Sequence, residues 1–88
     1  MNAEQLELLR NRLLMTARTL TKAGASREFF WMAARQSGFD LTDSQVETHL
    51  DYLEDGGLLK AEKSHVSAAL TRWRITKLGT DFLEGQRL

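Results

Sequence analysis

The first segment of the chain places apolar side chains at steps of three or four positions, the spacing of one helix face. Asn2 and Gln5 stand three residues apart at its start. Their side chains match a capping box, in which each accepts a hydrogen bond from the other's backbone. The pattern predicts a long amphipathic helix over residues 2–22. Its buried stripe is expected to contain Leu6, Leu9, Leu13, Ala17 and Leu20.

A second helix is expected over residues 26–37. Ser26 follows a break at Gly24 and is a good N-cap, because its hydroxyl accepts from a backbone N–H of the first turn. Gly38 supplies a left-handed residue that ends the helix. The inward side chains are expected to be Phe30, Ala33 and Ala34, with Phe39 as the apolar contact after the turn.

A third helix is expected over residues 42–55. Thr42 and Gln45 form a second capping box, and Gly56 and Gly57 end the helix. The inward side chains are expected to be Val46, Leu50 and Leu53.

Beyond residue 57 the apolar period changes to two, which is typical of strands. Strands are expected over residues 58–62 and 69–75, joined by a polar loop. Thr76 then caps a short last helix. The fold class expected is mainly α with a small β-hairpin. In the second strand Ala69, Thr71, Trp73 and Ile75 should face inward and Leu70, Arg72 and Arg74 outward, and the last helix should bury Leu78, Phe82 and Leu83.

Length and composition indicate one domain over residues 1–88. The hydrophobic share is 42% and the charged share 27%, which is typical of a globular protein. The chain has no cysteine, which excludes disulfides and thiolate zinc sites. Charged residues in the first twenty positions argue against a signal peptide or a membrane span, so no membrane is expected and the cytoplasm is the expected location. These residues are Glu4, Glu7, Arg10, Arg12 and Arg18.

Charge is unevenly distributed although the net charge is zero. Residues 1–39 carry six basic and three acidic residues, and residues 58–77 carry five basic residues against one acidic. Residues 40–57 carry six acidic residues and no lysine or arginine. A partner will therefore meet one strongly negative segment between two positive ones.

Two segments resemble winged helix-turn-helix proteins. Residues 46–59 resemble the recognition helix and following turn, where leucines three apart precede a glycine and a leucine. Residues 73–83 resemble the strand, threonine, glycine and apolar helix that end many such domains. The chain also looks similar to small winged-helix proteins of Mu-like phages and prophages. The resemblance implies three helices, a two-stranded wing and a short C-terminal helix.

The resemblance also implies duplex DNA as partner and a role as a transcriptional regulator. In that superfamily the third helix enters the major groove and the wing contacts phosphates or the minor groove. Gln45 would then read adenine, Thr48 would touch a thymine methyl, and the wing arginines would bind phosphate or guanine. The implied DNA-binding residues are Ser44, Gln45, Thr48, His49 and Tyr52 on the helix, and Lys63, Ser64, His65, Arg72 and Arg74 on the wing.

The third helix departs from this pattern in its charge. Glu47, Asp51 and Asp55 recur at four-residue steps along one flank, whereas affinity for DNA depends mostly on neutralising phosphates. A second hypothesis is therefore a protein-interaction winged helix, an adaptor or assembly factor whose acidic helix meets a basic protein partner. Both hypotheses stay open at this point.

A homodimer is also expected. Residues 29–32 are four consecutive large apolar side chains, and they cannot all face inward from one helix. Trp31 therefore either belongs to the core or reaches a partner. The dimer interface expected consists of Leu8, Leu14 and Met15, which fall off the buried stripe of the first helix, together with Trp31.

Catalysis, metal binding and cofactors are not expected. His49 and His65 are the only histidines, and they fall on different elements without a second ligand at metal spacing. No Ser-His-Asp arrangement and no glycine-rich strand-to-helix turn are recognisable.

Overall fold

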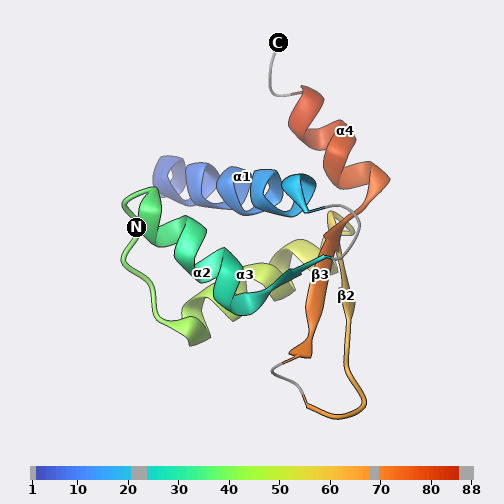
Figure 1. Cartoon of the computed structure of the whole chain (residues 1–88). Coiled ribbons are helices and arrows are strands. Elements are labelled where there is room, and N and C mark those ends of the chain that lie inside the picture. The colour runs from blue at the N-terminus through green and yellow to red at the C-terminus, as the bar shows by residue number, and fades with distance from the viewer. Residues whose placement is uncertain (1, 21–23, 68–69, 86–88) are drawn as a thin grey trace.

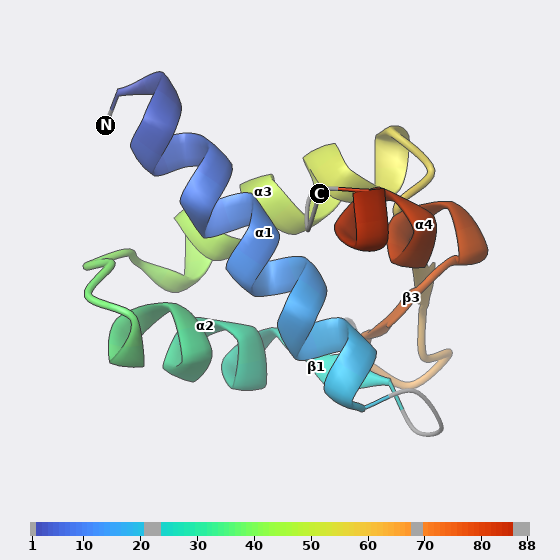
Figure 2. The ribbon, with the colours of Figure 1, turned by 90° about the horizontal axis from the view of Figure 1, so that it is seen from above.

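The computed structural model describes residues 2–20, 24–67 and 70–85. In these ranges α1 crosses over α2 and α3, and the hairpin of β2 and β3 projects away from the helices (Figure 1). Seen from above, α4 lies beside α1 (Figure 2). None of the described helices is long and apolar enough to cross a membrane. The elements are α1 (Ala3–Thr19), β1 (Ala25–Ser26), α2 (Arg27–Gln36), α3 (Asp43–Asp55), β2 (Leu59–Glu62), β3 (Arg72–Ile75) and α4 (Lys77–Gly85).

The predicted capping boxes start α1 and α3. The backbone N–H of Gln5 donates to Asn2 Oδ1 at 2.8 Å, and that of Asn2 donates to Gln5 Oε1 at 3.1 Å. Thr42 and Gln45 make the same reciprocal pair at the start of α3. The expectation that the first helix continues to residue 22 is wrong in part: α1 ends at Thr19, and residues 21–23 lie outside the described ranges.

The predicted boundaries of α2 are confirmed. Ser26 Oγ accepts from the backbone N–H of Phe29 at 3.3 Å. Gly38 ends the turn with a φ of 91°, a left-handed conformation that few side chains tolerate. The N–H of Phe39 then donates to the carbonyl of Ala34 at 3.0 Å, and Phe39 packs against the core.

The sheet has three strands where the sequence predicts two. β3 pairs antiparallel with β2, as expected, and its other edge pairs antiparallel with β1. Two extended residues just before α2 are enough to fill that edge, with Ala25 opposite Trp73. β3 is also shorter than the predicted strand 69–75, because Leu70 lies in a turn; Ala69 lies outside the described ranges.

One core joins the helices to the sheet. Leu50 and Trp73 are both buried in it, as predicted. The rings of Phe30 and Trp73 meet edge to face, with a distance of 6.3 Å between their centroids. Leu14 is fully buried too, so the expectation that it lies on the surface of the first helix is wrong. The helix α1 contacts α2, α3, α4 and β3, so more than one of its sides is covered.

The inward face of α4 differs from the prediction. Leu83 is buried at 6% exposure, whereas Leu78 and Phe82 are 57% and 42% exposed. Gly79 is buried on the same side of α4 as Leu83, four residues later. It lies so close to the carbonyl oxygen of Leu58 that an added Cβ at Gly79 would overlap that oxygen. Close approach at this glycine turns the helix so that its neighbours point outward.

Thr76 confirms its predicted role as the cap of α4. Its hydroxyl accepts from the N–H of Gly79 at 3.0 Å. The same hydroxyl donates to the carbonyl of Gly57 at 2.6 Å, which ties the start of α4 to the turn after α3.

Gly79→Ala is expected to destabilise the fold by about 1–3 kcal/mol, the usual cost of overpacking a close contact. The new Cβ would also lie 2.8 Å from Ile75 Cγ1. Gly85→Ala in the same helix is the control, because its Cβ meets nothing within 4 Å. Since alanine favours helix over glycine, the control should be neutral or slightly stabilising in urea denaturation. Equal effects at both sites would contradict the proposed close approach.

Candidate functional site

The exposed face of α3 carries the residues that the sequence analysis singled out. Val46, Leu50 and Leu53 face the core, as predicted. Ser44, Gln45, Thr48 and Tyr52 are exposed, and His49 is half-buried.

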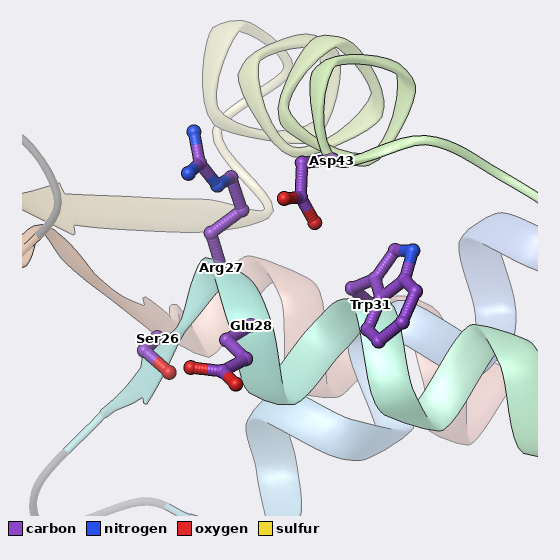
Figure 3. Close-up of a pocket in the computed structure, with 5 residues that line it drawn as sticks. All are labelled: Ser26, Arg27, Glu28, Trp31 and Asp43. Carbon is purple, nitrogen blue, oxygen red and sulfur yellow. The ribbon is translucent and has the colours of Figure 1, made fainter.

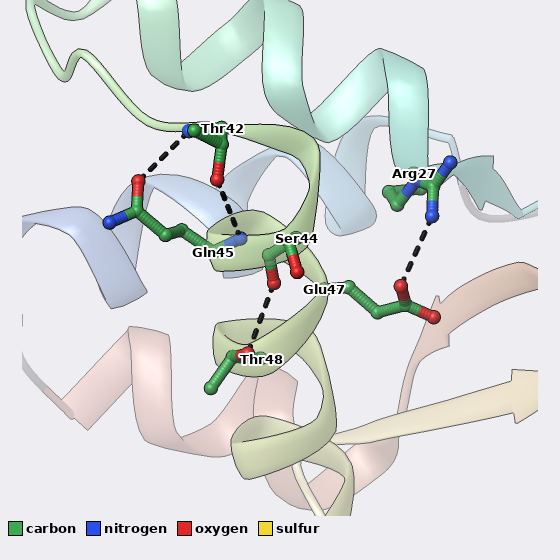
Figure 4. A network of polar contacts seen from close by, with 6 residues as sticks. All are labelled: Arg27, Thr42, Ser44, Gln45, Glu47 and Thr48. Atoms are coloured by element: carbon green, nitrogen blue, oxygen red, sulfur yellow. Dashed lines mark hydrogen bonds and ion pairs between the residues drawn. The ribbon is translucent and has the colours of Figure 1, made fainter.

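Polar groups at the start of α3 are already used within the helix (Figure 4). Gln45 Oε1 accepts from the N–H of Thr42 at 2.9 Å, and the hydroxyl of Thr48 donates to the carbonyl of Ser44 at 3.0 Å. Gln45 thus fills two predicted roles, helix cap and candidate base contact. Its side-chain NH₂ group and the Ser44 hydroxyl remain exposed donors for an incoming partner.

Tyr52 and His49 lie on the flank of α3 that faces α1. The guanidinium carbon of Arg10 lies 3.7 Å from the centroid of the Tyr52 ring. Burial lowers the pKa of His49, and the positive charge of Arg10 lowers it further. The two residues therefore form a group around Arg10 of α1.

The wing presents a mainly basic outer face. Lys60 lies opposite Arg74 and Glu62 opposite Arg72 in the antiparallel register, so all four side chains share one side of the hairpin. Arg74 Nε lies 2.8 Å from Glu62 Oε1, which leaves Lys60 and the exposed Arg72 in excess. Lys60 was not among the predicted wing residues, although it follows the buried Leu59 in an alternating strand. Lys63 and His65 are exposed beyond the end of β2, and Ser64 is half-buried there.

Two carboxylates of α3 have structural roles. Glu47 Oε2 lies 3.1 Å from Arg27 Nη1, an ion pair that links α3 to α2 (Figure 4). Glu54 Oε2 accepts from the N–H of Ala61 at 3.0 Å, so this backbone donor of the edge strand β2 has a partner. Acidic residues on this helix therefore serve the fold as well as the surface.

Asp51 and Asp55 form no ion pair within the described ranges. Partial burial raises the pKa of the Asp51 carboxyl. The charges of Glu47, Glu54 and Asp55 raise it further, and Lys63 acts in the opposite direction. Negative charge is therefore crowded on this flank.

A cleft of about 260 Å³ separates this flank from the wing. We call it the helix–wing cleft. Trp73 forms its buried wall, and the indole N–H of Trp73 has no acceptor within the described part of the chain. The cleft is lined by Glu47, Asp51, Ala61, Lys63, Ser64, Thr71 and Trp73.

Two other hollows lie apart from the wing. One, of about 390 Å³, opens between the starts of α2 and α3, where Trp31 and Asp43 face the same space (Figure 3). The other, of about 370 Å³, is a mainly apolar groove between α1, the end of α3 and α4, with Phe82 at its edge. Within the described ranges, no group of three or more acidic or histidine side chains is placed to hold a metal ion.

The four residues predicted to form a dimer interface do not share one surface. Leu14 is in the core. Trp31 is half-buried, and its indole N–H donates to the carbonyl of Leu41 at 2.7 Å, which holds the ring toward the segment before α3. Leu8 and Met15 alone are exposed, two turns apart on α1.

Asp51→Asn is expected to raise the melting temperature at pH 7 and to have less effect near pH 3. Folding raises the pKa of the Asp51 carboxyl above its ordinary value of 3.8. The group therefore contributes stability at a pH below 3.8, and this contribution is lost as the pH rises through the pKa of the folded state. The neutral amide removes that loss. Asp81→Asn on α4 removes the same charge elsewhere. Thermal unfolding of both variants at both pH values measures this. Equal changes in melting temperature for the two variants would contradict the expectation.

No protein-family model and no curated protein matches the chain. Solved structures do match it. A PadR family transcription regulator from Clostridium difficile matches with a TM-score of 0.70 at 20% identity, over 90% of this chain and 82% of its own. A mutant of S. aureus MepR matches with a TM-score of 0.70 at 16% identity, over 93% of this chain and 59% of its own. A mutant of Lactococcus lactis ZitR matches with a TM-score of 0.61 at 11% identity, over 99% of this chain and 51% of its own.

The chain thus spans little more than half the length of the MepR and ZitR chains. At identities this low, the TM-scores show a common fold. The order of helices, the three-stranded antiparallel sheet and these likenesses together identify the fold of the chain as a winged helix.

Proposed function

We propose that the domain is a DNA-binding transcriptional regulator in which the wing supplies most of the phosphate contacts. The observation that carries the proposal is the outer face of the hairpin, where Lys60, Arg72 and Arg74 outnumber Glu62. The likeness of the fold to a PadR family transcription regulator supports it.

The proposal divides the work between two surfaces. Phosphate contacts position a protein on the duplex, and contacts to base edges specify the sequence. Ser44 and the NH₂ group of Gln45 are exposed donors suited to base edges, and the methyl group of Thr48 suits a thymine methyl. Because residues 40–57 carry six acidic residues, α3 adds little to the attraction for DNA. Affinity should then depend mainly on the basic wing.

Replacing Arg72 and Arg74 together by alanine is expected to weaken binding to every duplex. Each phosphate contact contributes roughly 0.9 to the slope of log affinity against log salt concentration. The double variant should therefore flatten that slope by about two. Fluorescence anisotropy with duplexes of random sequence at several salt concentrations measures this slope. Replacing Arg12 and Arg35 by alanine is the control, because it removes the same charge from exposed positions on α1 and α2.

Equal flattening by both double variants would contradict a phosphate-binding wing. Binding weaker than about 10⁻⁴ M to every duplex at low salt, below the usual range of non-specific binding, would contradict the DNA-binding proposal itself.

A second candidate function is capture of a basic protein partner by the acidic flank of α3. Asp51 and Asp55 favour it, because neither forms an ion pair within the described ranges. Crowded carboxylates repel one another and are stabilised by a cation placed among them. The domain would then act as an adaptor or assembly factor.

We also propose that the protein forms a homodimer through the outer face of α1, where Leu8 is 57% and Met15 42% exposed. The chain mass is 10.0 kDa, so sedimentation at micromolar concentration should give about twice that mass. Leu8→Glu combined with Met15→Glu should give the monomer, because a charge opposes burial at an interface. Val66→Glu on the wing is the control, at 87% exposure. A wild-type protein that sediments as a monomer would contradict the proposal.

A further inference from the structure

We propose that Glu54 is a positioning residue, which holds the wing against α3 so that both surfaces contact one duplex at the same time. The proposal rests on the DNA-binding function proposed above, and it names the residue on which sequence discrimination depends. Its expectation is opposite to that from charge alone. Although Glu54 is acidic, its removal should weaken binding to the preferred DNA sequence.

The bond from Glu54 reaches the wing at the level of its basic face. Glu54 Oε2 accepts from the N–H of Ala61 at 3.0 Å. Ala61 follows Lys60 in β2, and its partner residue in β3 stands between Arg72 and Arg74. Holding the backbone at Ala61 therefore holds the strands that carry the basic side chains.

The turn between α3 and β2 leaves freedom in the angle of the hairpin. It consists of Gly56, Gly57 and Leu58, and glycine restricts the backbone least. The backbone hydrogen bond from the N–H of Leu58 to the carbonyl of Leu53, at 2.9 Å, lies at the base of the hairpin. Within the described ranges, no hydrogen bond other than that of Glu54 joins α3 to β2 or β3, and no ion pair does so.

Apolar packing also joins the wing to α3, but it differs from this bond in kind. Leu53 and Leu59 are both buried in the common core, so the base of β2 lies against α3. Apolar attraction is non-directional, whereas a hydrogen bond weakens steeply as its angle closes. The bond from Glu54 therefore fixes an orientation that burial of the leucines alone does not.

Orientation matters because the two surfaces have different tasks. In the proposed function the exposed donors of Ser44 and Gln45 read base edges, and the wing supplies phosphate contacts. When two linked elements bind one ligand, the gain from the second contact is lost if geometry prevents both from engaging. A misaligned wing would still attract any duplex through its charge. Loss of the bond should therefore reduce discrimination between sequences more than it reduces non-specific binding.

Two variants at Glu54 separate geometry from charge. Glu54→Ala and Glu54→Gln remove the same negative charge, but the amide oxygen of glutamine can still accept from the N–H of Ala61. Asp55→Ala and Asp55→Asn are the matched controls. Asp55 is the exposed neighbouring acid, and it forms no ion pair with any described residue. Both Asp55 variants should bind DNA as tightly as the wild type or slightly more tightly.

The test measures binding of the whole protein to two duplexes by fluorescence anisotropy. One duplex is selected by the wild-type protein from a pool of random sequences, and the other is a shuffled version of it. Glu54→Ala should weaken binding to the selected duplex by about threefold to tenfold, the range that corresponds to one hydrogen bond. Its binding to the shuffled duplex should change little. Glu54→Gln should bind both duplexes at least as tightly as the wild type.

Hydrogen exchange of the free protein measures the bond without DNA. The amide of Ala61 should exchange slowly in the wild type and in Glu54→Gln, and faster in Glu54→Ala. The amide of Thr76, which donates to the carbonyl of Leu58 at 3.1 Å, should stay protected in all three proteins. That pattern would show an intact hairpin that has lost its tie to α3. Thermal unfolding checks that each variant is folded at the temperature of the DNA measurements.

Four results would overturn the role of Glu54 while DNA binding stands. They are equal binding of the selected duplex by Glu54→Ala and Glu54→Gln, equal weakening of both duplexes by Glu54→Ala, the same weakening by Asp55→Ala, and an unprotected Ala61 amide in the wild type. A wild-type protein that does not discriminate between the two duplexes would overturn it as well. If the wild type binds every duplex more weakly than about 10⁻⁴ M at low salt, the DNA-binding proposal and this inference both fail.

Discussion

The fold depends on β3 being paired on both edges with Trp73 at its centre. Trp73 lies opposite Ala25 on one side and Ala61 on the other, and its ring meets the edge of Phe30 in the core. The strand thereby joins the start of α2 to the wing. Since α2 and β2 both also contact α3, this strand and those contacts together set the position of the wing relative to α3.

Negative charge on α3 has a structural explanation in part. Glu47 links the helix to Arg27, and Glu54 binds the amide of Ala61 at the outer edge of β2. An exposed ion pair such as the first contributes about 0–1 kcal/mol, so these acids orient neighbours more than they stabilise the fold. Asp51 and Asp55 have no such role within the described ranges. They are what separates the surface of this domain from one shaped for duplex DNA alone.

Much of the fold was predictable because local signals agree with each other. The capping boxes at Asn2 and Thr42, the left-handed Gly38 and the alternation around Trp73 all act over a few residues, and all are confirmed. The two-residue strand β1 was not predictable, because its pairing depends on β3, which lies more than forty residues later in the chain. The site was harder to predict. Tyr52 and His49 are grouped with Arg10, which lies about forty residues earlier in the chain.

The sequence by itself determined the helices, the presence of a hairpin after them and which flank of α3 is acidic, because periodicity and charge order are local properties. Tertiary structure decided which apolar residues are buried. Leu14 is buried on a helix that contacts α2, α3, α4 and β3, and Gly79 lies against the carbonyl of Leu58 while Phe82, on the same helix, is exposed. It also brought Trp73 beside Glu47 and Asp51 in one cleft. Contacts between segments distant in the chain depend on how whole elements pack, and no short pattern encodes that packing.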